Sequence, residues 1–200
     1  MSLGAMPELA VTSSVAAGDK DSMPRATVEA RTFSKAGRFL FRAGAVYWAR
    51  EDFWISPGFT LEGGYHFDER WGVDLSSSLY LSTLDAAARE LRERDGVLPD
   101  AQQPILRVAA GPRYAFGYGK LLLEDLAIVL HFDLSLALRA GVLLTDQALN
   151  PGGELGLALQ VSSGSFLVWV ELGGWLGYEE RSGGALAGGP YGAGGVGLRL

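Results

Sequence analysis

The chain of 200 residues contains no cysteine and no long apolar run. The absence of cysteine excludes disulfides, thiolate metal ligands and cysteine nucleophiles. The most apolar stretch, residues 121–144, still holds three acids, a histidine and an arginine. Because each acid or arginine at mid-membrane would cost about 2.5 to 3.5 kcal/mol, this stretch is excluded as a transmembrane helix.

Positive charge is also scarce. There are 17 Lys and Arg against 23 Asp and Glu, which gives a net charge of -6, and no basic block occurs. Binding to a phosphate backbone therefore has little electrostatic support, and we expect no nucleic-acid partner. Glycine, in contrast, is abundant: the 28 glycines are about twice what an average protein of this length carries.

Residues 1–35 are rich in small and polar types and contain Pro7 and Pro24. They predict a flexible leader, which could be a remnant of a signal region, although neither a basic nor an apolar signal segment is visible. Residues 36–200 predict one β-barrel domain.

From Gly37 onward the hydropathy pattern has a period of two. Phe59, Leu61 and Phe67, for example, alternate with polar residues, and about eight such segments of roughly ten residues follow one another between turn-like sequences. Tilted strands of this length would project to roughly 23 Å, close to the ~25 Å apolar band of outer-membrane barrels. We therefore predict an all-β fold, a closed antiparallel eight-stranded transmembrane β-barrel of the outer-membrane type.

Charged residues in these segments fall opposite the apolar face. A barrel whose exterior contacts lipid must place them in its lumen, where acids and bases can pair. The predicted lumen charge network is Arg42, Glu62, Asp74, Arg107, Arg113, Asp133, Arg139, Glu154, Glu171 and Arg199. Glycines on the same face would make room for these long side chains.

Aromatic residues gather near the ends of the predicted strands, as in the two interfacial girdles of membrane proteins. The predicted interfacial aromatics are Trp48, Trp54, Tyr65, Phe67, Trp71, Tyr114, Phe116, Phe166, Trp175 and Tyr178. Short connections, such as 68–70 and 163–165, are expected at the periplasmic end, and longer ones at the outside. The connection 117–129 is unusually long for the periplasmic end, and its leucines suggest a short interfacial segment. In the longest outer loop, Asp85 is a candidate N-cap of a short surface helix.

Two alternatives assign other functions to the same pattern. A soluble lipocalin-like barrel would turn the leucines inward around an apolar ligand and the charges outward. A membrane-embedded lipid hydrolase would use His66 or His131 with Ser76, Ser78 or Ser135, oriented by Asp74 or Asp133. No Gly-x-Ser-x-Gly elbow or metal-ligand spacing is present, so we expect no catalytic residues, metal or cofactor.

Three stretches resemble a known family: residues 64–75 (GYHFDERWGVDL), 118–120 (YGK) and 131–134 (HFDL), with 31–39 (RTFSKAGRF) similar to its start. They resemble the outer-membrane β-barrel domain family of myxobacteria and their relatives, over about residues 33–200. The resemblance implies a bacterial outer-membrane barrel without assigned chemistry, some members being similar to components of gliding or envelope machinery. We therefore expect a non-enzymatic barrel with a filled lumen that contacts membrane lipid, anchors surface loops for envelope structure or attachment, and has envelope proteins as possible partners.

Overall fold

The computed structural model describes residues 34–50, 53–96, 101–123, 128–179 and 185–200. Almost all of the predicted leader, residues 1–33, lies outside this part of the chain. Ser34 and Lys35 were assigned to the leader, but they belong to the same compact unit as the strands, which spans Ser34–Leu200. This unit therefore begins two residues before the predicted barrel domain.

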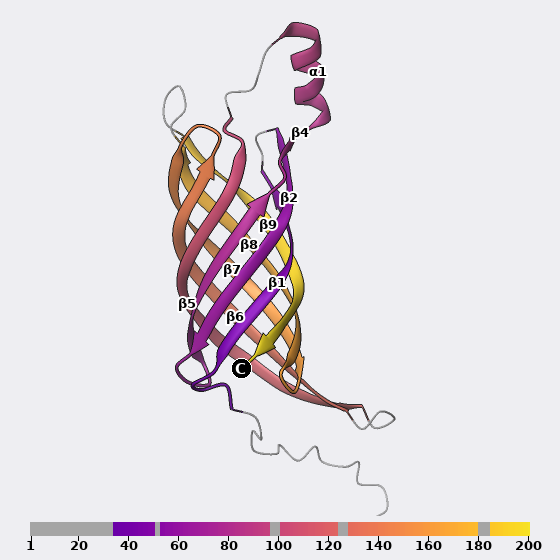
Figure 1. Cartoon of the computed structure of the whole chain (residues 1–200), viewed down its shortest axis with the longest axis vertical. Coiled ribbons are helices and arrows are strands. Elements are labelled where there is room, and N and C mark those ends of the chain that lie inside the picture. Colours follow the sequence, from indigo (N-terminus) through magenta and orange to yellow (C-terminus); the bar gives the residue numbers. More distant parts are fainter. Residues whose placement is uncertain (1–33, 51–52, 97–100, 124–127, 180–184) are drawn as a thin grey trace, which may run out of the picture. The chain divides into compact units, whose positions relative to one another are not determined.

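Eight long antiparallel strands form a closed barrel (Figure 1). Each strand pairs with the next long strand in the sequence, and the first also pairs with the last, which closes the sheet. A two-residue strand, β4 (Thr83–Leu84), extends the ladder at one end of β2. The long strands are β1 (Phe39–Ala49), β2 (Trp54–His66), β3 (Trp71–Tyr80), β5 (Pro104–Leu123), β6 (Ile128–Thr145), β7 (Leu149–Ser163), β8 (Phe166–Glu179) and β9 (Ala185–Arg199). The predicted fold class is thereby confirmed.

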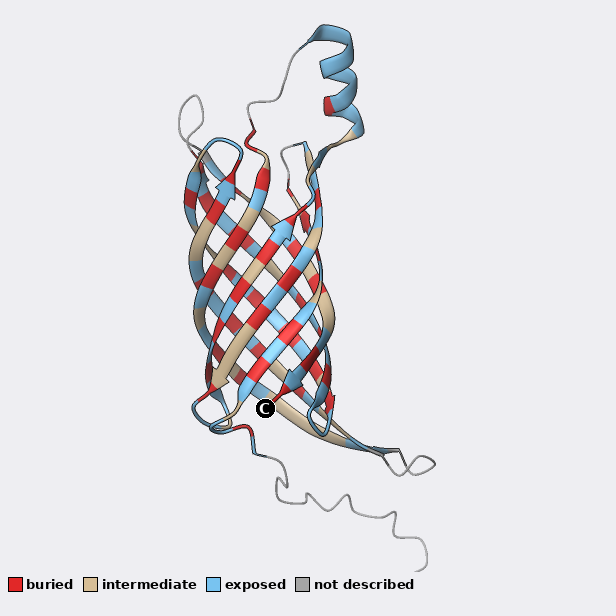
Figure 2. Cartoon of the chain, in the orientation of Figure 1, coloured by how far each residue is buried: buried red, intermediate tan, exposed pale blue. Residues whose placement is uncertain are grey.

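Burial alternates along every strand, as the chequered colouring in Figure 2 shows. On β2, Phe59 and Leu61 are 63% and 64% exposed, whereas Thr60 and Glu62 are 2% and 6% exposed. The apolar side chains therefore form the exterior and the polar ones fill the interior. This is the opposite of the apolar interior that the lipocalin-like alternative requires.

The turns between β2 and β3 and between β7 and β8 lie at one end of the barrel, which we call the inner end; the short connection 146–148 between β6 and β7 lies at the opposite, outer end. At the inner end, residues 67–70 join β2 to β3, and a turn at residues 164–165 joins β7 to β8. At the outer end, β1 ends at Ala49 and β2 begins at Trp54. The predicted connection 117–129 is mostly strand, because β5 continues to Leu123 and β6 starts at Ile128. Leu121 and its neighbours thus belong to a hairpin rather than to a separate interfacial segment; residues 124–127 lie outside the described part.

A short helix, α1 (Ala86–Asp95), follows β4 at the outer end. The Asp85 carboxylate accepts a hydrogen bond from Ala88 N at 2.7 Å, which satisfies one of the free N–H groups of the first turn. Gly96, at φ 66°, ends the helix in a left-handed conformation. The predicted N-cap and helix are confirmed. None of the described helical residues forms a helix long and apolar enough to span a membrane.

The inner turn between β2 and β3 is fixed by two acids. Asp68 Oδ1 accepts hydrogen bonds from Trp71 N at 2.6 Å and Arg70 N at 2.7 Å. These bonds, that from Trp71 first, lower the pKa of the Asp68 carboxyl below its ordinary value. Glu69 Oε1 accepts from Ser34 Oγ at 2.6 Å and Lys35 N at 3.0 Å, so this turn also holds the residues that precede β1.

Candidate functional site

The middle of the lumen contains a buried layer of four arginines and four carboxylates. We call it the ionic layer. Each long strand except β9 contributes at least one member, so the layer connects the walls of the barrel. Its members are Arg42, Glu62, Asp74, Arg107, Arg113, Arg139, Glu154 and Glu171, each 6% exposed or less. Formal charges of +4 and -4 cancel, which is the condition under which so many ions can be buried together.

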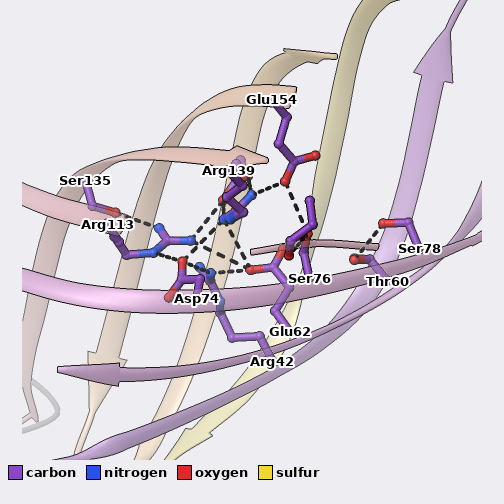
Figure 3. A network of polar contacts seen from close by, with 12 residues as sticks. Arg42, Thr60, Glu62, Asp74, Ser76, Ser78, Arg113, Ser135, Arg139 and Glu154 are labelled. Carbon is purple, nitrogen blue, oxygen red and sulfur yellow. Dashed lines mark hydrogen bonds and ion pairs between the residues drawn. The ribbon is translucent and has the colours of Figure 1, made fainter. Parts of the chain in front are cut away.

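Arg139 of β6 lies at the centre of the ionic layer (Figure 3). Its Nη1 is 2.6 Å from Glu154 Oε1 and 2.8 Å from Glu171 Oε1, and its Nη2 is 3.3 Å from Asp74 Oδ2. These carboxylates come from β7, β8 and β3, so a single guanidinium crosses the lumen and binds three other strands.

Two more arginines share carboxylates of the layer. Arg113 Nε donates to Asp74, and its Nη2 lies 3.2 Å from Glu171 Oε2. Arg42 Nη2 donates to Glu62 and lies 3.5 Å from Asp74 Oδ2. Because each carboxylate is shared between arginines, no single ion pair can open without disturbing the others.

Glycine makes the close packing of this layer possible. A Cβ atom at Gly156 would lie 2.5 Å from Glu171 Oε1 and 2.8 Å from the Tyr191 hydroxyl. At Gly64 it would lie 2.5 Å from Asp74 Oδ1. These lumen-facing positions therefore have no room for a side chain, because the neighbouring acids occupy it.

Toward the outer end, Arg107 is surrounded by four aromatic rings. Its guanidinium carbon lies 4.4 Å from the ring centre of Tyr191, 5.6 Å from Trp175, 5.7 Å from Tyr80 and 6.0 Å from Trp48. Its Nε is 3.2 Å from Glu154 Oε2, which links this aromatic cage to the ionic layer. The cage fills the lumen with rings at this level.

The prediction that Trp48 and Trp175 lie in an interfacial girdle is wrong. They are 0% and 3% exposed and point into the lumen. Trp48 shares the inward parity of Arg42 on β1, and Trp175 shares that of Glu171 on β8. Trp54 is also on the inward-facing parity of β2, where it is half-buried and donates from Nε1 to Ala101 O at 3.1 Å. Alternation along a strand, rather than nearness to a loop, decides where each ring points.

The other predicted interfacial aromatics lie on the exterior. Tyr65 and Phe67 contact each other with ring centres 5.4 Å apart, and Trp71 and Tyr114 contact each other at 4.7 Å. Six of these seven residues are at the inner end, and one is at the outer end. The inner-end residues are Tyr65, Phe67, Trp71, Tyr114, Phe116 and Phe166, and the outer-end residue is Tyr178.

A hydrogen-bonded strap, residues 101–103, lies at the outer rim of the barrel. Gln102, which is 3% exposed, accepts at Oε1 from Asn150 Nδ2 at 2.6 Å and Thr145 Oγ1 at 2.8 Å. Gln103 N donates to Asp146 Oδ1 at 2.7 Å. Residues 101–103 are thus tied to the ends of β6 and β7 above the aromatic cage.

The two remaining predicted lumen charges lie nearer the inner end. Asp133 accepts an ion-paired hydrogen bond from Lys35 Nζ, and Arg199 is buried on β9. Lys35 was missed as a lumen residue because it precedes the first strand and so has no place in the alternating pattern. A second missed pair, Arg50 Nη2 and Glu179 Oε1, lies at the outer end with its atoms 2.8 Å apart. Glu179 lies on β8 with the same inward-facing parity as Glu171, so alternation along this strand is enough to predict that it faces the lumen.

The three serines of the hydrolase alternative hydrogen-bond to lumen groups other than histidine, and its His66 is buried at the inner end of β2. Ser76 Oγ donates to Glu154 Oε1 at 3.1 Å, Ser78 Oγ donates to Thr60 Oγ1 at 3.0 Å, and Ser135 Oγ accepts from Arg113 Nη1 at 2.8 Å. His131 Nδ1 is instead 2.7 Å from the Tyr118 hydroxyl. These hydroxyls are therefore engaged in the lumen network rather than aligned with a histidine base.

Within the described ranges, no group of three or more His, Asp or Glu side chains is arranged to hold a metal ion. Every carboxylate of the ionic layer contacts at least one arginine, which supplies the positive charge that a cation would otherwise bring. The ion pairs of the lumen thus bind its own strands together.

A closed antiparallel wall, an apolar exterior and an ion-paired interior together define the outer-membrane type of transmembrane β-barrel.

No protein-family model and no curated protein matches the chain. Among solved structures, the chain is similar to Ail, the attachment invasion locus protein of Yersinia pestis, at 15% identity and a TM-score of 0.43 over 82% of this chain and 99% of Ail. A structure of Ail with the heparin analogue sucrose octasulfate gives 14% identity and the same TM-score, over 82% of this chain and 99% of that one. The outer-membrane protein OprG from Pseudomonas aeruginosa is similar at 13% identity and a TM-score of 0.40, over 83% of this chain and 97% of OprG.

Proposed function

We propose that the protein is a small, non-enzymatic barrel of the bacterial outer membrane whose sealed lumen makes it an anchor for its outer connections, serving envelope structure or attachment. The observation that carries this proposal is the ionic layer. Its guanidinium groups cross the lumen from wall to wall, so the space that a channel would need is occupied by side chains.

The lumen is occupied at two levels, one above the other. The ionic layer lies in its middle, and the rings around Arg107 lie at the level above. An ion that passed through would have to break buried ion pairs. Each broken pair would leave an uncompensated buried charge, which costs about 3 to 5 kcal/mol. The barrel therefore suits holding its loops in place better than conducting solutes.

The apolar exterior supports a membrane location. Large side chains on alternate positions, such as Leu138 at 60% and Leu172 at 65% exposed, would be costly in water and favourable against acyl chains. Membrane lipid is accordingly the first partner. Membership of the myxobacterial barrel family, and a role beside other envelope proteins, remain part of this proposal.

Two measurements test the anchor proposal. Fractionation combined with gel mobility before and after heating is expected to place the protein with the outer membrane and to show the heat-dependent shift of a folded barrel. In planar bilayers, the purified protein is expected to give no large, steady conductance. Recovery in the soluble fraction, or a stable open pore, would contradict the proposal.

A further inference from the structure

The hairpin of β5 and β6 continues past the rest of the wall at the inner end. The last β3 partner of β5 is Trp71, opposite Tyr114, and the last β7 partner of β6 is Ser162, opposite His131. Beyond these rungs the two strands pair with each other as far as Leu123 and Ile128. We call residues 117–123 of β5 and 128–134 of β6 the arm; on the β6 side residues 131–134 still pair with β7, and residues 128–130 continue beyond it. Figure 1 shows the arm running sideways from the lower end of the barrel.

A β-bulge marks the point where the arm leaves the wall. The register shifts between Ala115 and Gly117, so Phe116 is the extra residue on β5. A bulge bends its strand and increases the local twist. It therefore gives a local reason for the arm to turn away from the axis of the neighbouring strands.

Over the rungs nearest the barrel, the arm has two chemically different faces. Gly117, Gly119 and Leu121 lie opposite Leu134, Phe132 and Leu130, and this apolar face continues the exterior of the barrel. Tyr118 and Lys120 lie opposite Asp133 and His131, and this second face continues the lumen side. Where the wall bends outward, the exterior face turns toward the leaflet and the lumen side turns toward water.

Glycine and phenylalanine shape the apolar face. A Cβ atom at Gly119 would lie 1.9 Å from Phe132 Cζ, so the Phe132 ring lies across the position that a side chain would occupy. Phe132 nevertheless remains 38% exposed, and Leu121 is 52% exposed. A two-stranded ribbon with such exposed apolar surface is marginal in water by itself and needs an apolar contact.

We infer that the arm lies in the headgroup region of the inner leaflet, with Leu121 and Phe132 against acyl chains and Lys120 on the aqueous side. This inference rests on the proposed membrane location. The apolar face is continuous with the lipid-facing exterior, including Phe116 at 55% exposed. Beyond Tyr114, β5 has no rung with β3, and such an edge favours the headgroup region over the hydrocarbon, because backbone groups can reach water and phosphate there. The next rung, Leu122 with Val129, is 57% and 42% exposed on the other face, so the described end of the arm is apolar on both sides.

The absence of cysteine makes the test direct, since each introduced cysteine is the only labelling site. Leu121→Cys and Lys120→Cys, labelled with an environment-sensitive fluorophore, place the probe on opposite faces of the arm. The proteins are reconstituted in phosphatidylcholine and phosphatidylglycerol vesicles, and their folded state is checked by heat-dependent gel mobility. Doxyl-labelled lipid is expected to quench the Leu121→Cys probe several-fold more than the Lys120→Cys probe, and aqueous iodide is expected to do the reverse.

Two further positions separate failure of this inference from failure of the proposed function. Leu138→Cys places the probe on the exposed wall, and Glu93→Cys places it on α1. If lipid quenches Leu138→Cys while iodide quenches Leu121→Cys as strongly as Glu93→Cys, the arm projects into water and this inference is wrong. Shielding of Leu121→Cys from both quenchers would also overturn it, because a protein surface, such as a second copy, would then cover the arm. Loss of lipid quenching at Leu138→Cys would refute the membrane location itself.

Discussion

Arg139 and Glu154 occupy the same rung of the β6–β7 ladder, and their side chains meet inside the barrel with Nη1 2.6 Å from Oε1. The same guanidinium also reaches Glu171 on the far side of β7. One residue thus links a neighbouring strand through the ladder and a more distant strand through the lumen.

We expect Arg139→Met to destabilise the barrel by about 3 to 5 kcal/mol, because Glu154, Glu171 and Asp74 would lose a shared buried partner. Unfolding by urea in lipid vesicles, followed by gel mobility, measures the change. Leu138→Met is the matched control, since the neighbouring side chain is 60% exposed on the exterior and should change stability by less than about 1 kcal/mol. Equal stability of the two variants would show that the ionic layer does not hold the strands together.

The tryptophans should divide into two groups by their contact with lipid. In single-tryptophan variants, brominated lipid is expected to quench Trp71, which is 49% exposed, and to leave Trp175, which is 3% exposed, almost unquenched. Fluorescence of the folded protein in vesicles checks this directly. Strong lipid quenching of Trp175 would mean that its ring faces outward after all.

Glycines on the two faces should differ in their tolerance of a methyl group. Gly156→Ala is expected to cost about 1 to 3 kcal/mol, because the new Cβ would overlap Glu171 and Tyr191. Gly63→Ala is the control, since its nearest neighbour would be Phe41 at 4.0 Å on the exterior. Urea midpoints of the two variants and the parent protein give the comparison, and a larger loss at Gly63 would contradict the described packing.

The Asp68 turn should make a pH-dependent contribution to stability. Because its pKa is lowered in the folded state, the carboxylate stabilises the turn above the ordinary aspartate pKa of about 3.9, and this contribution is lost as pH falls through the lowered value. The stability difference between the parent protein and Asp68→Asn should therefore be constant near neutral pH and shrink in acid. Urea unfolding of both proteins from about pH 6 down to about pH 2 measures it; a difference that grows in acid would show the opposite sign.

Alternation determined most of what the sequence could predict. It located the wall and placed Glu62 and Arg139 in the lumen, because a period of two assigns each residue to one face as soon as the strand is known. Trp48 and Trp175 were misplaced when their nearness to loops was given more weight than their parity. The contacts within the ionic layer could not be predicted, since Arg139 and Glu171 are 32 residues apart and come together only when β6, β7 and β8 have paired.

Structural features that lie outside the alternating pattern could not be predicted from the sequence either. Lys35 precedes the first strand, and only the fold of the inner turn brings it to Asp133. The sequence predicts a connection over residues 117–129 rather than paired strands, because the alternation shifts at the Phe116 bulge. Local irregularities therefore limited the prediction more than the global topology did.

The connection between β3 and β5, which contains α1, lies outside the barrel wall. β3 pairs directly with β5, and β1 with β9, so the cylinder is complete without the helix. The Asp85 and Gly96 caps make the helical turn locally self-contained. A foreign segment in place of residues 86–95 should consequently leave assembly of the cylinder intact, which heat-dependent gel mobility would measure.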